Sequence, residues 1–248
     1  MLTYLVFILI FLKNKYNFFN YKEIMDTRFW GKSGWELCHS IAYCYQPDSN
    51  SEYYKKFYKS LQHVLPCIFC RRSFKKFIEL YQINIESKRS LTKWIYDIHN
   101  CVNDKLRNQG YPIEPNPSLK EVDKIYEKFT SSIKCMVGFD FIYSILFNYN
   151  LEVSETRKKG YILFFNSLCH VLPNEKIRTI YSDYLSTFPI EECFKKVIEK
   201  QSICPLKKWG HRLEKCMKKK CCSYKERCEK IEKHRVQKCT DQTCRIIN

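Results

Sequence analysis

The sequence predicts an all-α protein built from two consecutive helical bundles, the second a diverged copy of the first. The 248 residues are 45% hydrophobic and include only 6 glycines and 8 prolines, so core-forming residues are frequent and turn formers are scarce. From Met25 onward the apolar residues recur with the period of a helix rather than that of a strand. A segment near residue 60 is also repeated near residue 167, which indicates duplication.

The helical period defines a first domain over residues 26–132, a four-helix bundle with a short fifth helix. A proline-rich stretch from Gly110 to Pro117 ends the fourth helix, and Ser118 to Phe129 forms the short fifth one. The apolar faces of the first four helices are marked by Trp35, His39 and Ala42 or Tyr43, by Phe57, Leu61 and Val64, by Phe74, Phe77, Ile78 and Tyr81, and by Leu91, Trp94, Ile95, Ile98 and Val102.

Residues 133–203 are predicted to be a second, redox-inactive copy of this bundle. The segment from Tyr58 to Pro66 matches the segment from Phe165 to Pro173, and both contain the order Ser-Leu-x-His-Val-Leu-Pro. In the same register the copy replaces cysteines and polar groups by other residues while it keeps apolar positions. A scaffold or an interaction surface is therefore expected there, not a second reactive centre.

The two ends of the chain differ from this pattern. Residues 1–25 form a hydrophobic segment whose apolar run is shorter than the about 20 residues that span a bilayer, and it lacks the marks of a signal peptide. It is either an uncleaved anchor or an upstream extension ahead of a start at Met25. Residues 204–248 form a basic, cysteine-rich tail. The formal net charge of +17 favours contact with nucleic acid or an anionic surface.

Fifteen cysteines point to redox or metal chemistry. Cys67 and Cys70 form a Cys-x-x-Cys motif directly after Pro66, where a helix is expected to begin. The positive end of a helix, together with Arg71 and Arg72, lowers the pKa of a thiol, and this spacing lies within reach of a disulfide. Because no second motif of this kind completes a zinc ribbon, a reversible dithiol is favoured.

Two more motifs flank the cysteine pair: Gly31-x-x-x-Trp35-x-x-x-His39 before it, and His99-Asn-x-Val-Asn103-x-x-Leu after it. The second places an imidazole and two carboxamides on one helical face, where they can hydrogen-bond a cofactor, and the first supplies flat rings. Each residue alone is as readily explained by core packing. In this order and spacing, over residues 28–130, the three motifs resemble the Erv/ALR family of FAD-dependent sulfhydryl oxidases.

The resemblance implies that Cys70 lies against FAD and that Cys67 is the interchange sulfur, exposed to the dithiol of a protein substrate. Electrons would pass through the pair and FAD to O2, giving H2O2. Two departures from the family pattern, Gln46 before Pro47 and Arg107-Asn108 in place of Gly-Lys, leave the phosphate contacts open. The residues implied to hold FAD are Arg28, Gly31, Lys32, Trp35, His39, Tyr43, Tyr45, His99, Asn100, Asn103, Lys105 and Leu106.

Related enzymes carry a second cysteine pair that relays electrons from bulky substrates. Cys216 with Cys221, or Cys239 with Cys244, would be that shuttle here. The alternative is a zinc cluster drawn from the cysteines of the tail, including Cys222 and Cys228, and from His234. The rival to an oxidase is accordingly a basic, zinc-bearing nucleic-acid-binding or structural protein whose N-terminal motifs only pack a bundle.

Family resemblance implies a homodimer, whereas a duplicated bundle would cover the dimer face within one chain; both remain open. The abundance of Lys, Asn, Ile and Tyr, together with a duplicated inactive bundle, resembles oxidases of large DNA viruses. For such an enzyme the expected location is the host cytoplasm or the virion, with membrane association through the N-terminal segment, and its products would be disulfides where these are otherwise rare.

Overall fold

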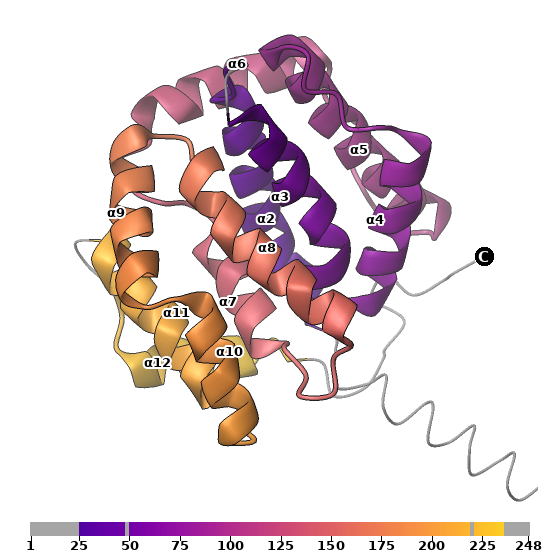
Figure 1. Cartoon of the computed structure of the whole chain (residues 1–248). Coiled ribbons are helices and arrows are strands. Elements are labelled where there is room, and N and C mark those ends of the chain that lie inside the picture. Colours follow the sequence, from indigo (N-terminus) through magenta and orange to yellow (C-terminus); the bar gives the residue numbers. More distant parts are fainter. Residues whose placement is uncertain (1–24, 48–49, 219–220, 236–248) are drawn as a thin grey trace, which may run out of the picture.

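The computed structural model describes residues 25–47, 50–218 and 221–235. Within these ranges the chain is helical throughout, apart from connecting segments and one isolated bridge between Met25 and Arg235, and the all-α prediction is confirmed (Figure 1). The helices are α2 (Thr27–Tyr43), α3 (Ser51–Val64), α4 (Ile68–Leu80), α5 (Lys88–Asn108), α6 (Leu119–Ser132), α7 (Phe139–Phe147), α8 (Glu155–Val171), α9 (Glu175–Thr187), α10 (Ile190–Glu199), α11 (Cys204–Met217) and α12 (Tyr224–Glu232).

No helix of the described ranges is both long and apolar enough to cross a bilayer. Of the predicted hydrophobic segment at residues 1–25, residues 1–24 lie outside the described residues.

Helices α2 to α5 form the first bundle, and α6 lies across α2 and α5. Local signals set their ends. Ser87 caps α5 by accepting a hydrogen bond from the Ser90 amide at 3.0 Å, and Ser118 and Glu121 cap α6 reciprocally. The predicted fifth helix is present, and it continues to Ser132, three residues beyond the expected end.

The second bundle repeats the architecture of the first at an offset of 107 residues. Helix α4 spans residues 68–80 and its counterpart α9 spans residues 175–187. A hydrogen bond is repeated as well. Arg71 donates to the carbonyl of Leu65 at 2.8 Å, and the equivalent Arg178 donates to the carbonyl of Leu172 at 2.7 Å. The duplication read from sequence therefore extends to individual side-chain contacts.

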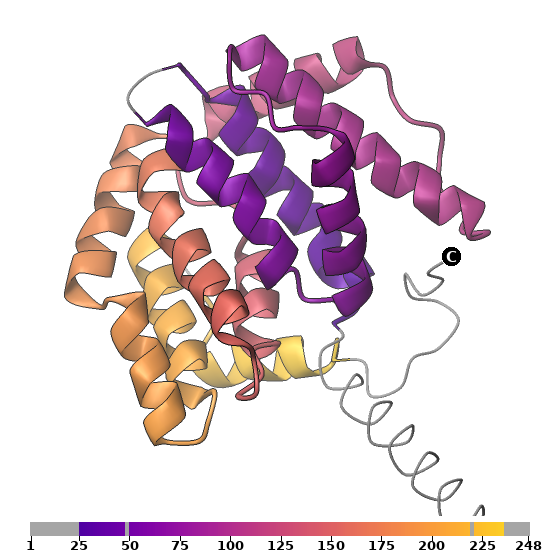
Figure 2. The ribbon, with the colours of Figure 1, turned by 45° about the vertical axis from the view of Figure 1, so that its right-hand side comes forward.

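The two bundles meet along α3 and α8, with equivalent residues facing each other (Figures 1 and 2). Phe57 stacks on Phe164, its counterpart at the same offset, with ring centroids 5.5 Å apart. Gly34 likewise faces its own counterpart, Phe141. Contact between equivalent positions is the property of an interface with twofold symmetry, in which one patch pairs with itself. The chain thus contains both halves of a pseudo-dimer.

The predicted boundary of a separate tail at residue 204 is wrong. Helix α11 packs into the core of the second bundle through its buried apolar face. The indole of Trp209 donates to the carbonyl of Phe188 at 2.8 Å, as the indole of Trp94 donates to the carbonyl of Tyr81 at 2.9 Å in the first bundle. Helix α11 is therefore the counterpart of α5. Its apolar period was hidden by the lysines between the core positions.

The place equivalent to the face of Trp35 and His39 is filled in the second bundle. Ile142 and Leu146 stand there and are fully buried. Gly210 lets α11 approach α7 so closely that a Cβ at this position would lie 2.5 Å from Leu146 Cδ1.

A glycine at the interface of the bundles gives a first test. A Cβ on Gly160 of α8 would lie 2.4 Å from the Cβ of His63 on α3, an atom that cannot move without the helix. We expect Gly160→Ala to lower the free energy of unfolding by about 2 kcal/mol, measured by urea denaturation. The control is Gly31→Ala, where no atom lies within 4 Å and alanine should stabilise the helix by up to about 1 kcal/mol. Equal stability of the two variants would contradict this packing.

Candidate redox site

The cysteine pair stands at the start of α4, as the sequence predicted. Cys67 is the N-cap residue with extended backbone, and its Sγ accepts a hydrogen bond from the amide of Cys70 at 3.3 Å. Cys70 lies in the first turn. Both sulfurs are therefore next to the positive end of a helix of 13 residues, where a thiolate is favoured over a thiol.

The expected exposure of Cys67 to an incoming dithiol is not found. Cys67 is only 1% exposed, whereas Cys70 is half-buried and lines a cavity. Just before Cys67, the carbonyl of Pro66 accepts a hydrogen bond from the amide of Met25 at 3.0 Å, so the chain that leads into α2 runs beside the motif. A substrate sulfur can reach Cys67 only after a local opening.

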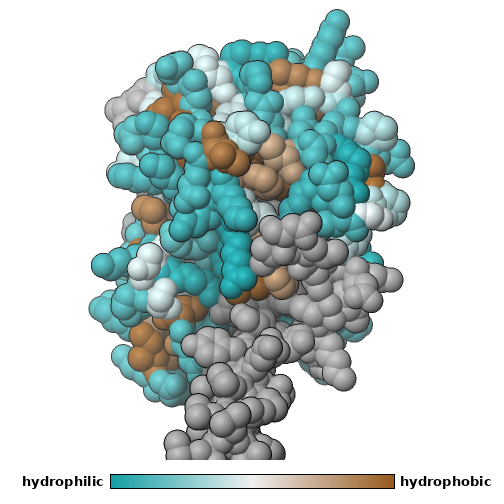
Figure 3. Space-filling view, turned by 90° about the vertical axis from the view of Figure 1, so that its right-hand side faces the viewer, coloured by the Kyte–Doolittle hydropathy of each residue, from teal (hydrophilic) through white to brown (hydrophobic). Residues whose placement is uncertain are grey.

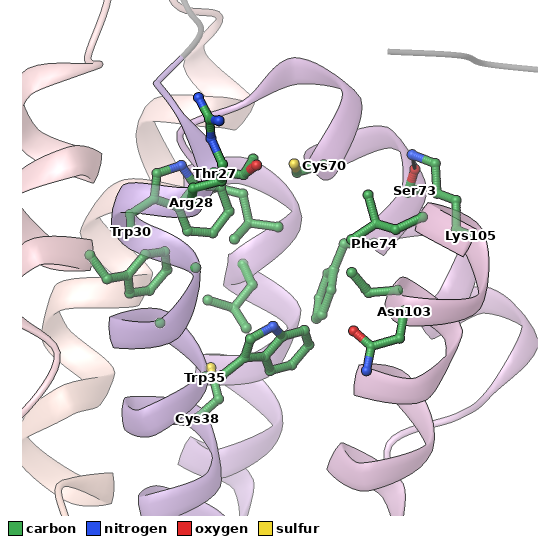
Figure 4. A pocket seen from close by; sticks show the side chains of 17 residues that line it. Thr27, Arg28, Trp30, Trp35, Cys38, Cys70, Ser73, Phe74, Asn103 and Lys105 are labelled. Carbon is green, nitrogen blue, oxygen red and sulfur yellow. Dashed lines mark hydrogen bonds between the residues drawn. The ribbon is translucent and has the colours of Figure 1, made fainter. Parts of the chain in front are cut away.

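A cavity of about 250 Å³ lies between α2, α4 and α5, with Cys70 at its rim (Figure 4). Trp35 and Phe74 project into it from α2 and α4, and Asn103 borders it from α5. Of the residues predicted to hold a cofactor, those that line this cavity are Arg28, Gly31, Trp35, Asn103, Lys105 and Leu106.

A cluster of stacked aromatic rings adjoins the cavity. Trp35 stacks on His99 with ring centroids 3.9 Å apart and an interplanar angle of 13°, and His39 stacks on Tyr126 at 4.5 Å and 15°. The two histidines are joined by a hydrogen bond of 3.1 Å between His39 Nε2 and His99 Nδ1. A flat ligand that enters this cluster must separate one of the stacked pairs, because their faces already cover each other.

Both histidines of the cluster are neutral near pH 7. Burial, with a smaller effect of His99, lowers the pKa of His39 to about 3, and burial lowers the pKa of His99 to about 4. The Nδ1 atom of His39 is buried and has no hydrogen-bond partner. Since buried polar atoms are almost always paired in native proteins, this nitrogen is available to a bound ligand.

The other predicted cofactor residues lie apart from the cavity. The hydroxyl of Tyr43 donates to Asp123 at 2.7 Å and so ties α6 to α2. Tyr45 is fully buried and donates to a backbone carbonyl in the segment before α5. Lys32 is exposed and Asn100 is half-buried. The structure brings Tyr43 to the aromatic cluster and leaves Tyr45 in the core near the loop after α2.

Sequence reasoning did not find several residues of the cavity wall. Trp30 and Cys38 flank Trp35 on α2, and their helical spacing was the available signal. Burial raises the pKa of Cys38 to about 12, so this thiol stays protonated and is no competing nucleophile. Phe141 reaches the cavity from the second bundle, and Tyr126 joins the rings from α6. No local pattern could reveal contacts between residues so distant in sequence.

A second cavity, of about 600 Å³, lies on the outer side of α4 and α5. It shares Ser73 and Lys105 with the first, and the Lys105 ammonium donates to the Ser73 hydroxyl at 2.7 Å between them. Arg72 and Lys76 add two more cations to its lining. Where grey atoms do not cover it, the face that carries α4 and α5 is mainly hydrophilic, with scattered apolar groups among the polar ones (Figure 3). This cavity can accept an anionic group next to the ring-lined one.

The alternative of a zinc cluster finds no support in the part of the chain that the structure describes, where no group of three or more His, Cys, Asp or Glu side chains is arranged to hold a metal ion. Cys239 and Cys244 lie outside the described residues.

Residues 32–127 match the model of the Erv1/Alr family. The chain is 38% identical over 89 residues to the mitochondrial FAD-linked sulfhydryl oxidase ERV1 of Saccharomyces cerevisiae, covering 35% of this chain and 47% of that protein. It is 35% identical over 85 residues to the probable FAD-linked sulfhydryl oxidase R368 of Acanthamoeba polyphaga mimivirus, covering 32% and 59% respectively. The chain thus spans about half the length of these relatives. No solved structure matches it significantly.

The buried histidines predict how stability depends on pH. The pKa values of about 3 and about 4 in the fold lie below the usual 6.5, so the unfolded chain binds protons more readily. The free energy of unfolding therefore has its full value above about pH 6.5. It falls as the pH drops from there toward the pKa values of the two histidines in the folded protein. We expect the protonation of each histidine in the unfolded chain to lower the free energy of unfolding by about 2 kcal/mol at pH 5. Urea denaturation at about pH 7.5 and pH 5 measures this loss of unfolding free energy. The loss should be smaller in a His39→Gln, His99→Gln double variant than in the unaltered protein, and an equal loss in both would refute the prediction.

Proposed function

We propose that this chain, whose residues 32–127 match the Erv1/Alr family, is an FAD-linked sulfhydryl oxidase that forms disulfide bonds in protein substrates. The observation that carries the proposal is the position of Cys70 on the wall of a cavity that Trp35 and Asn103 also line, with Cys67 one turn away at the helix cap. A dithiol beside a ring-sized cavity is the arrangement that thiol oxidation through a flavin requires.

The residues present fit FAD. Ligand sites measure about 300–1,000 Å³, so the cavity of about 250 Å³ accommodates a ring system rather than a whole dinucleotide. Trp35 and Phe74 give it flat apolar walls, and Asn103 gives hydrogen-bonding groups. The unpartnered Nδ1 of His39 supports the binding of a further part of the cofactor near the aromatic cluster. The Lys105 ammonium would serve the diphosphate, since the family's Gly-Lys is absent after Leu106.

The chemistry of the pair is thiol–disulfide exchange. With Cys67 and Cys70 oxidised, a substrate thiolate attacks the Cys67 sulfur, the bond between the two cysteines breaks, and Cys70 leaves as a thiolate. A second substrate thiolate then attacks the mixed disulfide, so the substrate leaves oxidised and the pair is reduced by two electrons. FAD, when bound, supplies the two-electron acceptor that returns the pair to the disulfide and delivers the electrons to O2, giving H2O2. The start of α4 stabilises the Cys70 thiolate at its first turn.

For the shuttle we propose Cys239 and Cys244 rather than Cys216 and Cys221. Cys216 lies in the last turn of α11, which packs beside α9 on the far side of the second bundle from α4 (Figure 1). Arg235, in contrast, pairs with Met25, whose amide is bonded to Pro66 next to Cys67. Cys239 follows Arg235 by four residues in the sequence, a tether of at most about 13 Å, and this short tether supports Cys239 and Cys244 as the shuttle.

The contact of α3 with α8 bears on the oligomeric state. Equivalent residues such as Phe57 and Phe164 already meet within one chain. This supports the alternative in which the duplicated bundle covers the face that a homodimer would use.

Substitution of the inner cysteine tests the proposed reaction. Purified protein should show flavin absorbance, and Cys70→Ser should retain the flavin while oxygen uptake with dithiothreitol falls by at least about 1,000-fold, because the leaving thiolate is gone. Cys135→Ser, at an exposed cysteine outside the site, is the matched control and should keep full activity. Purified protein without flavin absorbance, or undiminished oxygen uptake in Cys70→Ser, would contradict the proposed function.

The two candidate shuttles are separated by a pair of double variants. We expect Cys239→Ser with Cys244→Ser to lower oxidation of reduced, unfolded ribonuclease by about tenfold or more, because a tethered relay acts at high effective concentration. Oxidation of dithiothreitol should stay within about twofold, since a small dithiol reaches the inner pair directly. Cys216→Ser with Cys221→Ser should change neither rate, and the reverse pattern would assign the shuttle to that pair.

A further inference from the structure

The C-terminal end of the second bundle lies beside the redox motif of the first. We call residues 224–235, which comprise α12 and the three residues after it, the C-terminal strap. Helix α12 runs toward the end of α2 at which α4 begins (Figure 2). The carbonyl of His234 accepts a hydrogen bond from the amide of Asp26 at 3.0 Å, and Arg235 pairs with Met25.

Side chains hold the end of the strap in place. The ring of His234 stacks on Phe29 of α2, with centroids 4.1 Å apart and an interplanar angle of 10°. The guanidinium of Arg235 donates to the carbonyl of Phe147, at the end of α7, at 3.1 Å. The strap therefore joins the second bundle to the first turn of α2, whose residues Thr27 and Arg28 line the ring-sized cavity.

The strap is anchored by a buried ion pair. Glu214 of α11 is 0% exposed. Arg227 of α12 donates to it through Nε at 3.1 Å and through Nη2, and the hydroxyl of Tyr143 donates to it at 2.9 Å. Removal of one partner from such a pair leaves a buried charge without compensation. Docking of α12 therefore depends on Arg227 far more than on the exposed charges of the same helix.

We propose that the second bundle positions the exit of the C-terminal tail at the redox site, and that Arg227 is the positioning residue on which this depends. The inference rests on the proposed function, in which the tail relays electrons to Cys67 and Cys70. The proposal assigns a role to the second bundle, which lacks the cysteine pair of the first. In this bundle apolar residues and the ion pair of Glu214 fill the space that corresponds to the aromatic cluster of the first bundle.

The advantage is one of effective concentration. With the strap docked, Cys239 is tethered four residues beyond Arg235; with the strap released, the tether begins at Met217, 22 residues before Cys239. Local concentration falls roughly as the −3/2 power of tether length, so release should weaken the relay by about tenfold.

The test is Arg227→Met, with Lys225→Met as control, an exposed residue of the same helix that loses the same charge. The ratio of the rates with reduced, unfolded ribonuclease and with dithiothreitol should fall by about tenfold in Arg227→Met and stay unchanged in the control. Arg227→Lys should restore part of the ratio. Hydrogen exchange at the Asp26 amide, which is bonded to His234, should be faster in Arg227→Met and report release of the strap.

Two outcomes would overturn the inference: unchanged exchange at Asp26, which would show that Arg227 does not hold the strap, or faster exchange with an unchanged rate ratio. If Arg227→Met does not fold, His234→Ala serves as the second variant, because it removes the stack on Phe29 and leaves the Glu214 pair intact. It should lower the same rate ratio, and an unchanged ratio in His234→Ala would also overturn the inference. A fall in the ratio for Cys239→Ser with Cys244→Ser, but none for the strap variants, would refute only this inference. An unchanged rate ratio in both the double cysteine variant and the strap variants would refute the relay itself.

Discussion

The beginning of α4 is the point on which the rest of the structure depends. Cys67 ends the extended segment after Pro66 and caps the helix with its own sulfur, so the proposed redox pair and the positive helix end occupy the same place. The amide of Met25 is bonded to Pro66, and this ties the entry of α2 to the motif. A change in the cap would therefore move the sulfurs, the cavity rim and the docking of the strap together.

Duplication separated two demands that conflict within one bundle. A ring-sized cavity deprives its lining of packing contacts and so costs stability. The first bundle keeps this cavity, while the second fills the equivalent space with Ile142 and Leu146 and closes it by the approach of α11 at Gly210. Contact along α3 and α8 then joins the open bundle to the well-packed one. Phe141 shows how direct this support is, because it forms part of the cavity wall.

Buried ionisable side chains occur in both bundles, among them Arg71 in the first and Glu214 and Arg227 in the second. In the aromatic cluster beside the cavity the buried histidines His39 and His99 are neutral, because burial lowers their pKa values. In the second bundle the buried Glu214 and Arg227 form an ion pair that joins α12 to α11.

The sequence by itself determined the helices, the duplication and the redox motif, because apolar period, prolines and capping residues act within a few residues of one another. It placed Trp35, Asn103 and Cys70 together through their motifs. Only the tertiary structure decided that Cys67 is buried, that Tyr126 and Phe141 join the site, that Tyr45 does not, and that α11 and α12 belong to the second bundle. These outcomes depend on which surfaces meet between segments as far apart in the sequence as Met25 and Arg235, and no local pattern encodes such contacts.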